Sequence, residues 1–164
     1  MALSILIRGQ LDATCECSDE CFTKNNYGVN TNTTLSVNTP LGVLGGSVAA
    51  LSAGLDYTVV PANSVLMPKG LFVNDAAGAA FDNSPAVASG KVTVMKAMAC
   101  VEVDVYETRN AADTADLTYA VGEELYDSAQ GLLSNEVSTN LVVIGVVTKI
   151  PATASPTMGL DMRI

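Results

Sequence analysis

Cysteine is the residue type in this chain with the widest range of possible chemistry. Cys15, Cys17 and Cys21 lie close together, and Cys100 lies far from them in the sequence. Four thiolates can close a tetrahedral zinc site, but structural zinc is usually held by paired Cys-x-x-Cys motifs, which this spacing does not provide. A zinc site, a disulfide and free thiols all stay open, and free thiols are the interpretation that the sequence favours.

Carboxylates are the second source of possible chemistry, because a pair of Asp or Glu side chains can hydrolyse a glycosidic bond. Glu102 and Asp104 share one face of an expected strand with Lys96, and Glu123 and Glu124 stand beside an expected turn. Both arrangements are typical of solvated protein surfaces. We therefore expect these carboxylates to face water and not to form a catalytic pair.

The chain contains no histidine. This absence removes the commonest general base, the Ser-His and Cys-His nucleophile pairs and a frequent metal ligand. No phosphate-binding Gly-rich motif with a following lysine is present, and residues 42–46 lack the spacing of a dinucleotide-binding fingerprint. The sequence thus predicts a protein that is not an enzyme, with no catalytic residue, no metal ligand and no cofactor-binding residue.

The elements that would position any such side chain are short β-strands. Residues 3–7, 57–60, 65–67 and 71–73 predict short strands, with prolines at positions 61 and 68 as strand ends. The apolar run 141–147, bent at Gly145, and the alternating residues 158–164 predict a hairpin with a long loop. Residues 91–106 predict one long half-buried strand, because apolar and charged side chains alternate: Met95, Ala97, Ala99, Val101, Val103 and Val105 on one face, and Lys96, Glu102 and Asp104 on the other.

These patterns predict an all-β fold: a small β-barrel, β-tulip or sandwich with an extended or irregular N-terminal arm. Residues 1–55 would hold the first strand, a cysteine loop over residues 11–24 and an uncharged arm, and residues 56–164 would form the β-rich core domain. Residues 41–55 are rich in Gly and Ala, and a short helix, an extended arm and a pair of packed strands all stay open there.

Charge limits the classes of partner. Eight basic and seventeen acidic residues give a net charge of −9, which repels nucleic acid. No basic cluster suits a membrane surface, and the uncharged residues 25–55 are interrupted by Asn, Thr and Gly, so we expect no membrane association. Only 15% of residues are charged, which predicts apolar surface in contact with other protein, and without an export signal we expect synthesis in the cytoplasm.

Three segments resemble the small decoration (cement) proteins of tailed-bacteriophage heads: residues 120–134, residues 143–149 and residues 159–164. The likeness rests on Gly122, Leu125, Tyr126, Gly131, Leu132 and residues 144–147. The resemblance implies a homotrimer on the outer surface of a virion capsid, bound to the major capsid protein and stabilising the shell.

Two other classes remain as alternatives to a decoration protein. The first is a phage tail-tube or head-completion subunit, which would also be small, acidic and rich in β-strands. The second is a β-sandwich recognition module of the adhesin or carbohydrate-binding type. The scarcity of aromatic side chains, with no Trp and five Tyr, argues against the second class.

Overall fold

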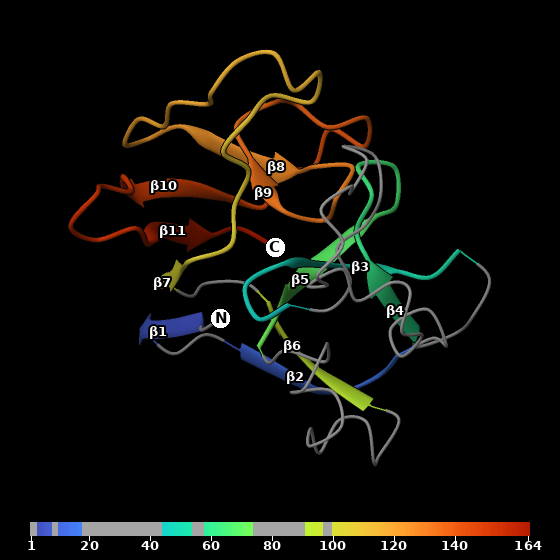
Figure 1. Ribbon diagram of the computed structural model, residues 1–164. Helices are drawn as coiled ribbons and strands as arrows, with labels where there is room; N and C mark the ends of the chain where they lie inside the picture. The colour runs from blue at the N-terminus through green and yellow to red at the C-terminus, as the bar shows by residue number, and fades with distance from the viewer. Residues whose placement is uncertain (1–2, 8–9, 18–43, 54–57, 74–90, 97–99) are drawn as a thin grey trace, which may run out of the picture.

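Every regular element among the residues that the computed structural model describes is a β-strand, which confirms the predicted all-β fold (Figure 1). The structure describes residues 3–7, 10–17, 44–53, 58–73, 91–96 and 100–164. No helix that could cross a membrane occurs within these ranges. The strands are β1 (Leu3–Ile7), β2 (Gln10–Cys17), β3 (Val48–Leu51), β4 (Thr58–Pro61), β5 (Pro68–Phe72), β6 (Lys91–Lys96), β7 (Cys100–Val103), β8 (Glu124–Asp127), β9 (Leu133–Ser134), β10 (Gly145–Lys149) and β11 (Met158–Met162).

The strands form two sheets that lie side by side (Figure 1). One is a six-stranded sheet with the order β1-β7-β11-β10-β8-β9, and the other is a barrel closed by β2-β4-β3-β5-β6. Among the described strand pairs, only β2 and β4 run parallel to each other. The barrel named in the predicted fold class is therefore present, with an open sheet beside it.

The predicted C-terminal hairpin is confirmed by the pairing of β10 with β11. Met158, Leu160 and Met162 of β11 are buried, as their alternation indicates. The predicted bend at Gly145 is wrong, because this residue opens β10 and pairs on both sides, with Met162 and Leu125. A Cβ atom at Gly145 would lie 2.7 Å from the Asp161 carbonyl oxygen, so the glycine permits close approach of two strands.

Residues 91–106 do not form one long strand, which corrects the prediction. β6 belongs to the barrel and β7 to the six-stranded sheet. The predicted buried face is confirmed in β7, where Val101 and Val103 are fully buried. In β6 Val94 is buried as fully as Met95, and Ala97 and Ala99 lie outside the described residues. Alternation indicates which side of a strand faces the core, but it carries no information about the sheet to which the strand belongs.

The cysteine loop predicted for residues 11–24 is wrong over residues 11–17, which belong to β2. Cys15 pairs with Val92 of β6, and Cys17 pairs with Val59 of β4. These neighbouring strands stabilise a β-strand that the small polar residues of the segment do not themselves predict. The rest of the segment, including Cys21, lies outside the described residues. The domain division at residue 55 stays a prediction, although β1, β2 and β3 all pair with strands beyond it.

For residues 41–55, the structure selects the packed-strand alternative over the part that it describes. β3 lies between β4 and β5 in the barrel, with Val48, Ala49 and Ala50 fully buried. The strand predicted for residues 65–67 is wrong, because these residues form a bend before β5. Asn63 accepts hydrogen bonds from the backbone N–H groups of residues 65 and 66 through its side-chain oxygen, which favours a turn over a strand.

One apolar core joins the two sheets. Its members come from the barrel and from the open sheet, and they pack together as a single cluster: Val48, Ala50, Ala62, Leu71, Met95, Val101, Val103, Leu125, Leu133, Ile144, Val147, Met158, Leu160 and Met162. Because both sheets bury side chains in this cluster, the loops between them are held in a defined relative position.

Replacing Gly70 with alanine should destabilise the barrel by about 2 kcal/mol, because the added Cβ would overlap the backbone of β6. That atom would lie 2.0 Å from the Met95 carbonyl oxygen. Gly122→Ala is the matched control, since its Cβ meets no atom within 4 Å and only its φ of +90° opposes the change, at about 1 kcal/mol. Urea unfolding of both variants measures the difference, and equal destabilisation would contradict the packing of β5 against β6.

Candidate functional site

A polar pocket of about 250 Å³ lies where the barrel meets the open sheet. Its walls come from residues 107–111, from residues 127–139 and from Ser64 in the connection between β4 and β5. Carboxylates and hydroxyl groups dominate these walls. A concave pocket with convergent polar groups is a typical place for a ligand to bind.

Asp127 ends β8 beneath this pocket, and the residue is only 1% exposed. One of its carboxylate oxygens accepts the Ser64 N–H at 2.9 Å, and the other accepts the side-chain amide of Asn140 at 2.9 Å. Asn140 also donates its side-chain amide to the Leu66 carbonyl at 2.8 Å and its backbone N–H to the Ser64 carbonyl at 3.0 Å. Asp127 and Asn140 thus tie the barrel to the connection between β9 and β10.

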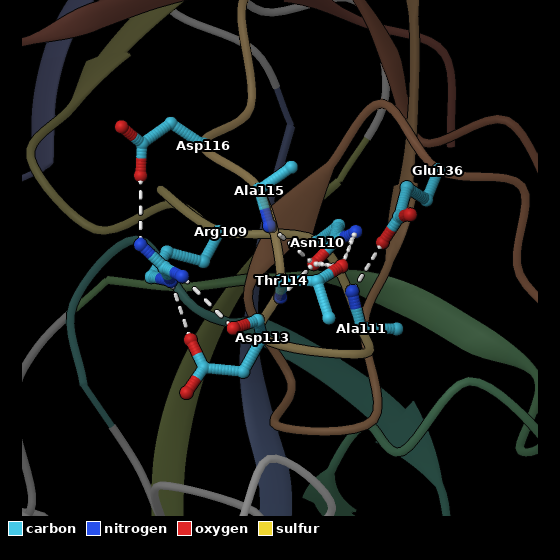
Figure 2. A network of polar contacts seen from close by, with 8 residues as sticks. All are labelled: Arg109, Asn110, Ala111, Asp113, Thr114, Ala115, Asp116 and Glu136. Carbon is cyan, nitrogen blue, oxygen red and sulfur yellow. Dashed lines mark hydrogen bonds and ion pairs between the residues drawn. The ribbon is translucent and has the colours of Figure 1, made fainter.

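The outer wall of the pocket begins with a loop that is held by its own polar side chains (Figure 2). The Arg109 guanidinium pairs with the carboxylates of Asp113 and Asp116, and it also donates to the Asp113 carbonyl at 2.8 Å. Asn110 accepts the Thr114 N–H at 2.8 Å through its side-chain oxygen. Arg109 is the only cation among the described residues that line the pocket, and these contacts satisfy it within the loop itself.

Two glutamates face the pocket from different segments. Burial raises the pKa of Glu107, a hydrogen bond with Ser128 lowers it, and the nearby charge of Glu136 raises it, with a net upward shift. Glu136 is exposed and accepts the Ala111 N–H at 2.7 Å, which connects the Arg109 loop to the other wall (Figure 2). A carboxyl with a raised pKa in a pocket can act as an acid, so this pair is the nearest approach to an acid–base site in the described residues.

The remaining polar groups of the pocket are occupied by local structure. The Ser128 hydroxyl oxygen accepts the N–H groups of Gln130 and Leu132, and the Ser134 hydroxyl oxygen accepts that of Glu136. Ser138 donates its hydroxyl to the side-chain oxygen of Asn140 at 2.7 Å. Since these hydroxyls hold turns in place, the pocket is organised as a structural joint between loops.

The carboxylates singled out in the sequence do not gather in this pocket. Glu102 is partly buried, contrary to the expected full exposure, because it accepts hydrogen bonds from Lys149 at 2.9 Å and from Thr157 at 2.8 Å. The hydrogen bond from Lys149 is the main cause that lowers the pKa of Glu102. Lys149 also donates to Ser155 and Thr157, so all three of its ammonium hydrogens have acceptors.

The remaining carboxylates singled out in the sequence are Asp104, Glu123 and Glu124. Asp104 and Glu124 are exposed, as expected, and Glu124 accepts the Tyr126 hydroxyl at 2.7 Å. Glu123 is half-buried and accepts the N–H of Ala120 at 3.0 Å and the side-chain amide of Asn135 at 3.0 Å. None of these three carboxylates lines the polar pocket.

Of the four cysteines, only Cys100 has a side chain within the described structure. It is a half-buried free thiol whose sulfur lies 3.9 Å from a carboxylate oxygen of Asp161. No group of three or more Cys, Asp or Glu side chains in the described part of the chain is arranged to hold a metal ion. The choice between zinc, disulfide and thiol for Cys15, Cys17 and Cys21 stays open.

The sequence analysis did not identify Glu107, Asp127, Glu136 or Asn140. A usable signal was present for Asp127, because it stands two residues after the buried Leu125 and therefore on the same face of β8. An acidic residue at an inward strand position predicts a buried hydrogen-bond partner. No comparable signal marks Glu107 and Glu136, which meet only through the fold.

Comparison of the chain with models of protein families, with curated proteins and with solved structures found no match.

Replacing Asp127 with alanine should lower the free energy of unfolding by about 3 kcal/mol, because the partly buried N–H donors of Ser64 and Asn140 lose their acceptor and a buried side chain is removed. Asp116→Ala is the matched control. Its side chain is 81% exposed, so the loss of its ion pair with Arg109 should cost less than about 1 kcal/mol. Chemical denaturation provides the measurement, and a similar loss in both variants would contradict the structural role of Asp127.

Glu107→Gln should make stability less dependent on pH. A carboxyl with a raised folded-state pKa contributes stability below its ordinary value of 4.5, and this contribution is lost as pH rises through the folded value. The variant has no such loss. The difference in stability between the variant and the wild type should therefore favour the variant more at pH 7 than at pH 4. Thermal unfolding at the two pH values tests this, and an advantage that grows towards low pH would be the opposite result.

Proposed function

We propose that this chain is a structural virion protein that decorates and stabilises a bacteriophage capsid, bound as a homotrimer to the major capsid protein. The protein would act through non-covalent contacts and not as an enzyme. The observation that carries the proposal is an apolar patch on a rigid all-β scaffold whose polar groups are largely engaged in internal contacts. The resemblance of residues 120–134 and 143–149 to decoration proteins supplies the particular class.

The apolar patch consists of Leu51, Val65, Met67 and Leu141, which are 41%, 64%, 57% and 71% exposed. Backbone contacts place these residues side by side. Leu51 donates its N–H to the Met67 carbonyl at 2.9 Å, and Asn140, next to Leu141, donates to the carbonyls of Ser64 and Leu66. Large apolar side chains that gather on a surface mark sites of contact with other protein.

We expect a second copy of the chain to cover the apolar patch. Interfaces within permanent homo-oligomers are more apolar than other protein interfaces, and none of the four patch residues is charged. A stable interface buries about 800 Å² on each partner, so the patch would form its apolar centre with polar residues around it. Repetition of the contact in a closed ring then strengthens attachment to a shell without further contacts.

The polar surface suits the exposed side of such a particle. The net charge of −9 keeps copies of the protein apart in solution except where apolar surface overcomes the repulsion. The Arg109 loop presents residues whose charges are already paired, so it offers a rigid outer surface with little tendency to bind other molecules. These properties support a structural role over a catalytic one.

Val65→Asp should weaken self-association at least tenfold, because the interface would then bury an unpaired carboxylate. Val121→Asp introduces the same change at a residue that is 67% exposed and outside the apolar patch, and it should leave association unchanged. Sedimentation velocity over a range of concentrations gives the oligomeric state of each protein. A chain that stays monomeric throughout, or equal effects of the two substitutions, would reject the homotrimer.

Attachment to the shell requires its own measurement. The purified chain should sediment with empty capsids assembled from the major capsid protein of the same genome and should appear as regular surface projections in negative stain. Val65→Asp should reduce occupancy, whereas Val121→Asp should not. Capsids that remain bare at saturating protein would reject the proposed function.

A further inference from the structure

A groove of about 410 Å³ lies between residues 106–119 and the connection between β10 and β11. Its apolar lining comes from Tyr106, Leu117, Tyr119, Pro151 and Pro156. The volume falls within the range of about 300–1,000 Å³ that is usual for ligand pockets. The groove is distinct from the polar pocket at the joint of the two sheets.

The walls of the groove are fixed before any ligand arrives. The Tyr106 hydroxyl donates to the Pro156 carbonyl at 2.8 Å, which joins one wall to the other, and the Tyr119 hydroxyl donates to the Glu107 carbonyl at 2.6 Å. The two rings meet edge to face, with centroids 5.8 Å apart and an angle of 86° between their planes. A preformed groove of this kind loses little conformational entropy when it binds a ligand.

The lining favours a peptide over a sugar. None of the residues that line the groove carries a charged or amide side chain, and the hydroxyls of Thr108 and Thr153 are the only polar side-chain groups besides the two phenols. A sugar would leave many of its hydroxyls without partners in such a groove, which costs binding energy. Proline-rich segments instead present pyrrolidine rings and few N–H donors, and aromatic-lined grooves are their usual binding sites.

The charges around the groove indicate the sign of the charge that a partner should carry. Burial is the main cause that raises the pKa of Tyr106 and Tyr119, and the next cause is a neighbouring carboxylate, Asp104 for Tyr106 and Glu107 for Tyr119. The cations on the flanking segments are already paired, Arg109 with two aspartates and Lys149 with Glu102. The groove is thus apolar with an acidic surround, because Asp104 is exposed beside Tyr106 and two aspartates outnumber Arg109 in the segment that forms one wall. This charge complements basic side chains.

We propose that this groove binds an extended, proline-rich segment of another protein that carries basic side chains. The pyrrolidine rings would pack against the two tyrosines and the two prolines of the lining. Arginine or lysine residues beside the proline run would lie near the acidic surround. This inference does not rest on the decoration of a capsid, and it adds a peptide-binding site to the molecule.

The probe is a short synthetic peptide of prolines and leucines with an arginine at each end, titrated into isotopically labelled full-length protein. Amide signals of residues 106–119 and 150–157 should shift, whereas those of the barrel strands should not. Two further peptides, one with glutamates in place of the arginines and one with glycines in place of the prolines, should each bind at least about tenfold more weakly. Equal affinity of the glycine peptide would overturn the proposal.

Ala152→Arg places a bulky cation on the exposed lining of the groove and should weaken binding of the basic peptide at least tenfold. Ala53→Arg adds the same charge at an exposed residue after β3 and should leave the affinity unchanged. Binding that survives Ala152→Arg, equal losses in the two variants, or no signal shifts at millimolar peptide would overturn the proposal. So would shifts of the groove residues with oligosaccharides in place of the peptide.

Discussion

The buried carboxylate of Asp127 is the interaction on which the arrangement of the two sheets depends. A charged group that is almost fully removed from water is stable only when hydrogen bonds replace its hydration. Its two oxygens receive N–H groups from the connection between β4 and β5 and from the connection between β9 and β10. The apolar core holds the two sheets together, and these directional contacts fix the two connections that border the polar pocket.

The same contacts determine what the surface presents. With Ser64 and Leu66 held by Asp127 and Asn140, the bend before β5 turns Val65 and Met67 towards solvent. Elsewhere Arg109 is paired with aspartates of its own loop, and Lys149 of β10 is paired with Glu102 of β7. Polar groups with internal partners gain little from a ligand, so the exposed apolar side chains in the described part of the chain are the stronger candidates for binding.

Two apolar features therefore carry the proposals, and they differ in kind. The apolar patch is formed by separate side chains on turns and suits a broad protein surface, as in a homo-oligomer. The groove at Tyr106 and Tyr119 is concave, bounded by prolines and surrounded by acidic groups, and it suits a narrow extended segment. The proposed self-association and the proposed peptide binding would both act through non-covalent contacts.

Local pattern and global structure contributed differently to this fold. The sequence alone determined the all-β class, the C-terminal hairpin and the buried faces of β7 and β11, because period-two alternation is a local property of the chain. It did not determine that residues 91–106 divide between two sheets, that residues 11–17 form a strand, or that Glu107 and Glu136 share a pocket. The tertiary structure decided those points, since strand pairing and the meeting of distant carboxylates depend on contacts between segments that no local spacing encodes.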